Sequence, residues 1–99
     1  MARKQRLKKY PWQQRTAAVA RLENVLRDHF PQALCRVFPA GDQRLRVLVI
    51  DDQFNGLEFM KKRKFVLNEL NRARDNAELT PADMNEIGSI EVFSPLELV

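Results

Sequence analysis

Residues 45–70, LRVLVIDDQFNGLEFMKKRKFVLNEL, decide the fold that we predict for this chain. Apolar residues fill both alternating sets of 45–50, which indicates a central strand that is covered largely on both faces. The composition changes abruptly over 51–56, and this change predicts a short turn. Good helix formers follow from residue 57, so the strand leads through the turn into a basic helix. We expect a binding edge at this junction and no catalytic site.

Cap and turn signals divide the rest of the chain into elements. Thr16 is a favourable N-cap, and Pro31 ends the helix that follows it. Thr80 begins a capping box with proline at the first helical position, and Gly88 ends that short helix. A tight connection over 39–43 predicts a hairpin. The predicted helices cover 16–29, 57–73 and 81–86, and the predicted strands cover 33–38, 44–50 and 90–93.

This order of elements predicts an α+β fold. A chain of 99 residues is long enough for one core, and we expect a single domain over 16–99. The first two strands are joined by a hairpin and are therefore antiparallel neighbours. The segment 56–87 is long enough to cross over to a parallel last strand. The expected architecture is a three-stranded mixed sheet with the two longer helices on one face.

The helix predicted over 57–73 carries four consecutive cations. Helical spacing places Arg63 within the apolar face. Consecutive helical residues lie about 100 degrees apart, so the three neighbouring lysines spread round the remaining circumference and do not form one patch. The residues of the expected apolar face are Phe59, Met60, Val66, Leu67 and Leu70.

The charge of the chain is asymmetric. The net charge is +4, but residues 1–15 hold six cations and no acid, which leaves 17 − 6 = 11 cations and 13 acids, a net charge of −2, for 16–99. We predict that 1–15 is a flexible basic arm that suits a polyanion, with Tyr10 and Trp12 available to stack on unpaired bases. A solvated terminus, a Trp12 packed on the domain and a serine-poor transit peptide are the alternatives.

Residue counts argue against several functions. Cys35 is the single cysteine and His29 the single histidine, so neither an internal disulfide nor a Cys/His metal site is expected. We interpret Cys35 as a small buried residue and His29 as a partner of the helix dipole. The sequence has neither a nucleophile paired with a base nor a long apolar run. We therefore predict a cytoplasmic protein that is not an enzyme, holds no cofactor and does not enter a membrane.

Three segments resemble the BolA family, whose fold is of the class II KH-like type. They are VIDDQFNG at 49–56, KRKFV at 62–66 and IEVFSPLE at 90–97. The resemblance covers roughly residues 20–97. It implies nucleic-acid binding and an association with transcriptional regulation and the stress response.

The family also implies a protein partner, a monothiol glutaredoxin with which it shares an iron–sulfur cluster. Arg63 stands where the family has its helix histidine, and a guanidinium cannot ligate iron as imidazole does. The hairpin at 39–43 offers neither histidine nor cysteine. The alternative function is therefore an adaptor for a glutaredoxin-like partner that supplies no cluster ligand.

The main functional prediction is a module that binds DNA or RNA through the arm and the basic start of the second long helix. The chain lacks the G-x-x-G loop with which KH modules clamp the nucleic-acid backbone. On the alternative interpretation Phe54 fills the core, Gly56 permits a turn and the lysines only solubilise the helix. The predicted contact residues are Arg3, Lys4, Arg6, Lys8, Lys9, Tyr10, Trp12, Asn55, Gly56, Lys61, Lys62, Arg63 and Lys64.

Overall fold

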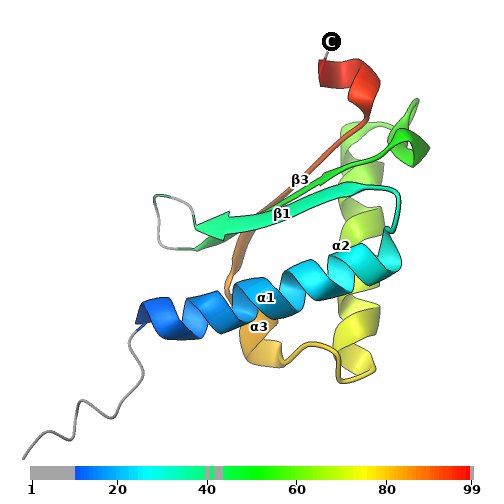
Figure 1. Ribbon diagram of the computed structural model, residues 1–99. Helices are drawn as coiled ribbons and strands as arrows, with labels where there is room; N and C mark the ends of the chain where they lie inside the picture. The colour runs from blue at the N-terminus through cyan, green and yellow to red at the C-terminus, as the bar shows by residue number, and fades with distance from the viewer. Residues whose placement is uncertain (1–10, 40, 42–43, 99) are drawn as a thin grey trace, which may run out of the picture.

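The computed structural model describes residues 11–39, 41 and 44–98 (Figure 1). Side chains are described from residue 16 onward. The helices and strands follow one another in the predicted order, with short 3₁₀ turns after β2 and β3. The elements are α1 (Pro11–His29), β1 (Leu34–Pro39), β2 (Leu45–Ile50), η2 (Asp52–Phe54), α2 (Phe59–Asp75), α3 (Pro81–Asn85), β3 (Ile87–Phe93) and η3 (Pro95–Leu98).

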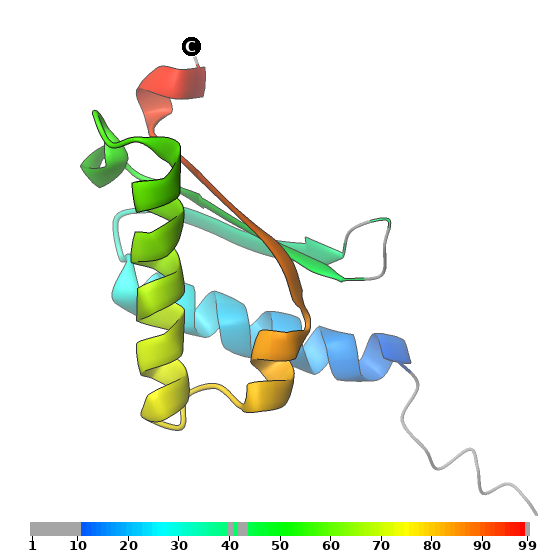
Figure 2. The ribbon, with the colours of Figure 1, turned by 180° about the vertical axis from the view of Figure 1, so that it is seen from behind.

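The three strands form one mixed sheet in the order β1-β2-β3. β1 pairs antiparallel with β2, and β3 pairs parallel with β2 after a crossover through α2 and α3. The predicted α+β arrangement with a central second strand is confirmed. α1 packs against β1 and α2 against β3, and Figure 2 shows α2 crossing α1 at a steep angle.

One face of the sheet carries the core. Leu45, Val47 and Val49 of β2 are fully buried, and they pack with Leu22 and Leu26 of α1. The residues that alternate with them in β2 are only half-buried. The expectation that both faces of this strand would be covered is therefore wrong for the second face, because both long helices lie on the first.

α1 begins at Pro11, five residues before the predicted start. Thr16 is consequently an interior helical residue and not the N-cap. Proline suits the first helical position, and Gln13, Gln14 and Arg15 are good helix formers, so the helix extends into the segment predicted as a flexible arm.

The buried stripe of α2 differs from the predicted one. It consists of Lys62, Val66, Leu70 and Ala73, so Arg63 lies at its edge. The predicted face was wrong for its other members, which are exposed. For Met60 and Leu67 the reason is the rotation of the helix, which is set by an aromatic contact on the opposite side. Phe59 lies in line with Val66 but is the first residue of the helix, before the buried stripe begins at Lys62. Those exposed members are Phe59, Met60 and Leu67.

That aromatic contact joins the residue that follows α1 to η2 and α2. The ring centroid of Phe65 lies 6.0 Å from that of Phe30 and 5.8 Å from that of Phe54. Phe30 and Phe54 are both buried, whereas Phe65 is partly exposed. Packing of Phe65 against this pair turns the opposite side of α2 away from the core and toward the outer edge of β3.

The connection from α2 to β3 confirms the predicted capping box. The Thr80 hydroxyl accepts a hydrogen bond from the Asp83 backbone, and the Asp83 carboxylate accepts one from the Thr80 backbone. That carboxylate is buried and also accepts hydrogen bonds from the Nε and Nη2 of Arg21, each at 2.7 Å. The Arg21 hydrogen bonds lower the pKa of Asp83 below its usual range. Gly88 does not end α3 as predicted; it lies within β3, at an irregularity in the pairing with β2.

Candidate nucleic-acid interface

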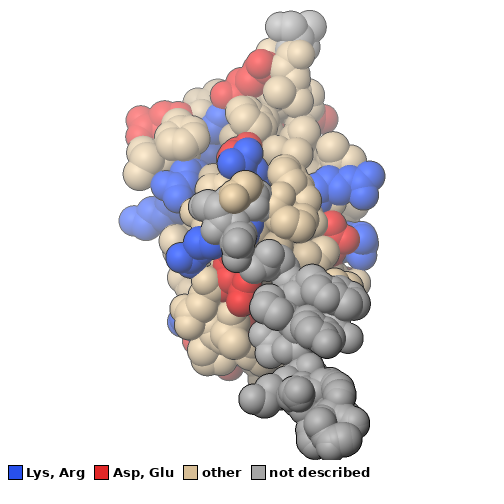
Figure 3. Space-filling model, turned by 90° about the vertical axis from the view of Figure 1, so that its left-hand side faces the viewer, with Lys and Arg blue, Asp and Glu red and all other residues tan. Residues whose placement is uncertain are grey.

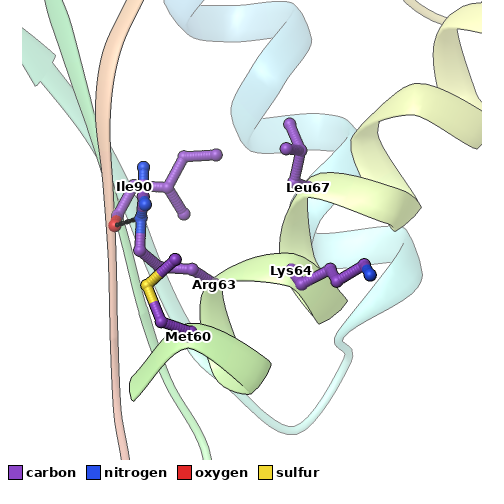
Figure 4. A pocket seen from close by; sticks show the side chains of 5 residues that line it. All are labelled: Met60, Arg63, Lys64, Leu67 and Ile90. Atoms are coloured by element: carbon purple, nitrogen blue, oxygen red, sulfur yellow. Dashed lines mark hydrogen bonds between the residues drawn. The ribbon is translucent and has the colours of Figure 1, made fainter.

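An open groove of about 340 Å³ runs between α2 and β3. Figure 4 shows Arg63 and Met60 extending from the helix toward the strand, whereas Lys64 extends away from it. The apolar side chains of Met60, Leu67 and Ile90 make up most of the lining. The groove therefore combines an apolar floor with two cations.

Arg63 is held in place by neutral groups. Its Nε donates a hydrogen bond to the carbonyl oxygen of Ile90 at 3.2 Å, and its guanidinium lies 5.9 Å from the ring centroid of Phe59. Because β3 is an edge strand, this hydrogen bond satisfies a carbonyl that has no neighbouring strand. Among the described residues no carboxylate pairs with Arg63, so its positive charge is available to a bound anion.

Lys62 is the clearest correction to the predicted contact residues. Its side chain is 2% exposed, and its Nζ donates to both carboxylate oxygens of Glu97 at 2.6 Å. Glu97 also accepts hydrogen bonds from the backbone and hydroxyl of Ser94. The hydrogen bond from Lys62 lowers the pKa of Glu97. Lys62 thus links α2 to η3 through its ion pair with Glu97 and is not a surface cation.

The other two lysines of this run are exposed, as the helical spacing predicted. Lys64 lines the groove, whereas Lys61 is not one of the residues that line it. The prediction that the four consecutive cations do not form one patch is confirmed. On the face shown in Figure 3, Lys and Arg also form separate groups with acidic side chains between them.

The turn before α2 supports the structural interpretation of its motif. Phe54 is 1% exposed, and the Asp51 side chain caps η2 by accepting a hydrogen bond from the backbone of Gln53. Gly56 has a φ of +81°, a backbone conformation that favours glycine. Asn55 and Gly56 are exposed but do not line the groove. They lie just before the N-terminus of α2, where the Glu58 side chain makes no capping hydrogen bond.

Most of the predicted basic arm lies outside the described residues. This holds for Arg3, Lys4, Arg6, Lys8, Lys9 and Tyr10. Trp12 belongs to α1 by its backbone, and its side chain is not described.

His29 takes part in an ion-pair network at the C-terminal end of α1. Its Nδ1 lies 2.9 Å from a carboxylate oxygen of Glu69, and its Nε2 lies 3.3 Å from one of Glu78. The hydrogen bond with Glu69 raises the pKa of His29, and Glu78 adds to this effect. The sequence predicted an interaction with the helix dipole alone and did not identify these two carboxylates.

Cys35 is a buried free thiol, as we interpreted it from the sequence. Burial raises its pKa, and the negative charge of Asp51 adds to the shift. Over the described part of the chain, no three His, Cys, Asp or Glu side chains are grouped closely enough to hold a metal ion. Within that same part, none of the helices has the length and apolar character needed to cross a membrane.

The sequence analysis missed both the groove and the attachment of η3. The groove could not be found because the exposure of Met60 and Leu67 follows from the rotation of α2. The attachment had a recognisable signal, since Ser94 followed three residues later by Glu97 is a capping-box pattern. Three comparisons, with models of known families, with curated proteins and with solved structures, gave no match for this chain.

Proposed function

We propose that this protein binds single-stranded nucleic acid in the groove between α2 and β3. The observation that carries the proposal is the combination of an apolar floor with unneutralised cations. Unpaired bases present flat apolar faces that stack on such surfaces, while the phosphates need positive charge beside them. A duplex does not offer its bases in this way, so a single strand fits the groove better.

Two cations can serve the phosphates at this site. Arg63 is oriented by Phe59 and by the Ile90 carbonyl, which reduces the entropy lost when it contacts an anion. Lys64 is exposed, and its side chain extends away from β3 (Figure 4). Phe59 is 57% exposed and provides a stacking surface beside Arg63.

The N-terminus of α2 supplies a further favourable field. Backbone N–H groups at a helix N-terminus attract anions, and in α2 the side chain of the N-cap residue Glu58 makes no hydrogen bond to them. Asn55 and Gly56 precede this end of the helix, and both are exposed, with no other heavy atom within 4 Å of the place that a Cβ of residue 56 would take. This arrangement offers a phosphate a place without the G-x-x-G loop of KH modules.

The sequence resemblance to the BolA family and its class II KH-like fold supports the same function. Under this proposal the protein is a regulator of transcription, and the cations at Arg3, Lys4, Arg6, Lys8 and Lys9 add affinity that does not depend on base sequence.

The test is the binding of fluorescently labelled single-stranded DNA and RNA, followed by anisotropy over a range of salt concentrations. Replacing Lys64 by glutamine should reduce the salt slope by about one phosphate contact. Arg72→Gln is the matched control, because Arg72 is an exposed cation on another side of α2 and outside the groove. An equal effect of the two variants would contradict binding in the groove. So would equal affinity for single strands and duplexes.

One observation favours a second function, that of a protein adaptor. Apolar surface is exposed just before α2 and along its first half, at Leu57, Phe59, Met60 and Leu67, and clustered apolar surface is typical of protein contacts. A monothiol-glutaredoxin-like protein is the partner that the resemblance suggests, with Arg63 unable to ligate a cluster. Capture of such a protein as a colourless complex, lost in Met60→Glu, would support this function. An iron–sulfur absorption band in the complex would contradict it.

A further inference from the structure

The face of the sheet opposite the helices is a second surface of this molecule. Along β1 and β2 its residues alternate with the buried ones, and Leu34 is 52% exposed. The pairing register arranges its side chains in rows that cross the three strands. The row at one end is Leu34, Ile50 and Phe93, and the row beside it is Arg36, Leu48 and Glu91.

The second row carries opposite charges at its two ends. Among the described residues nothing forms an ion pair or hydrogen bond with the side chain of Arg36, which is exposed. Glu91 forms an ion pair with Arg46 of its own chain, with 3.3 Å between its carboxylate and the Arg46 Nε, and this Nε is buried without a hydrogen bond. Arg36 and Glu91 are two strands apart, about 10 Å, so they do not neutralise each other within one chain.

We propose that this face binds a second copy of the chain, sheet against sheet, about a two-fold axis parallel to the strands and above β2. That symmetry places β1 of one copy over β3 of the other. Arg36 then meets the partner's Glu91, and the same contact is repeated on the other side of the axis. Leu34 lies over the partner's Phe93, and Ile50 lies over its own counterpart.

Charge selects this symmetry over the alternative. A two-fold axis perpendicular to the strands would place Arg36 over its own counterpart, and like charges in an interface are unfavourable. In the chosen arrangement Arg46 approaches its counterpart near the axis. The adjacent Glu91 of its own chain offsets that repulsion, and the rows diverge because packed sheets cross at about 30 degrees.

The size of the face predicts a weak dimer. Strands of six paired residues are about 20 Å long, and three strands are about 14 Å wide. The footprint is therefore roughly 300 Å² for each copy, below the roughly 800 Å² per partner of a standard stable interface. We expect association only at high protein concentration. This inference does not depend on the nucleic-acid proposal, because the groove is formed by other side chains.

Sedimentation equilibrium of the full chain, from about 10 μM to about 1 mM, tests the proposal over the range of weak affinities. The wild type should dimerise. Arg36→Glu alone and Glu91→Arg alone each make both charge contacts repulsive and should weaken association about tenfold or more. An equimolar mixture of the two variants should recover a dimer with one copy of each, because both contacts then become attractive. Circular dichroism confirms that each variant is folded.

Substitutions of exposed leucines provide a second test, which can be used even if a charge variant fails to fold. Leu34→Glu, on the exposed edge strand, should weaken the dimer, whereas Leu96→Glu, 71% exposed in η3 and off the sheet, should not. A wild type that remains monomeric to about 1 mM overturns the proposal. So does a mixture of charge variants that associates no better than either alone, or an equal effect of the two leucine variants.

Discussion

Replacement of Phe54 by alanine tests which side chains of the turn and of α2 are structural. Phe54 is 1% exposed, and its ring centroid lies 5.8 Å from that of Phe65 and 6.2 Å from that of Phe30. Removal of a buried phenylalanine costs about 3–5 kcal/mol, because both the transfer energy and the packing around the cavity are lost. Because the free energy of unfolding of a small domain is about 5–15 kcal/mol, we expect Phe54→Ala to lose a large fraction of this free energy.

The assay is equilibrium unfolding in urea, followed by circular dichroism. Phe59→Ala is the matched control, because Phe59 is 57% exposed and its removal should change the unfolding free energy by no more than about 0.5 kcal/mol. The order of the two variants should be reversed in oligonucleotide binding, where Phe59→Ala should have the larger effect. Loss of a stacking ring at Phe59 should cost about 1–3 kcal/mol of binding energy. A Phe54→Ala variant within about 1 kcal/mol of wild type in stability would refute the core assignment.

Three further predictions concern stability. The pKa of His29 is raised in the folded protein, so the contribution of its protonated form to the stability is complete below the unfolded pKa of about 6.5. This contribution is lost as the pH rises through the folded pKa. In His29→Gln this part of the pH dependence should be absent from urea midpoints measured across that range. The lowered pKa of Asp83 has the opposite sign, so its contribution is lost as pH falls through the folded pKa. At neutral pH Asp83→Ala should lose roughly 2–3 kcal/mol in urea unfolding, a value reduced because Arg21 is half-exposed, and no loss would contradict the pairing. Gly88→Ala should lose about 1–3 kcal/mol, since the new Cβ would lie 2.7 Å from the Cβ of Arg44; unchanged thermal unfolding would show that the strand can move.

The sheet and its connections could be predicted because their signals are local. The apolar residues that fill both alternating sets of 45–50 identified the central strand, and Thr80 with Asp83 marked the start of α3 by its capping box. The boundaries were less accurate, since α1 starts at Pro11 and β3 at Ile87. Single residues next to a cap or a bulge decide such boundaries, and the sequence pattern alone does not rank them.

The candidate site could be predicted only in part. Spacing placed Arg63 within an apolar face; in the structure it lies at the edge of the buried stripe and reaches across the groove to Ile90. The burial of Lys62 depends on its pairing with Glu97, which is 35 residues away, so no local pattern predicts it. The exposure of Met60 likewise depends on Phe65, whose contacts with Phe30 and Phe54 set the rotation of α2.

The most direct test of the central proposal is the titration of the ¹⁵N-labelled protein with a short single-stranded oligonucleotide, followed by backbone amide shifts. Binding in the groove predicts shifts concentrated at Phe59–Leu67 and around Ile90, with small changes in β1. Shifts that leave Arg63, Lys64 and Ile90 unchanged, or no shifts at saturating oligonucleotide, would contradict the assignment of the groove as a nucleic-acid interface.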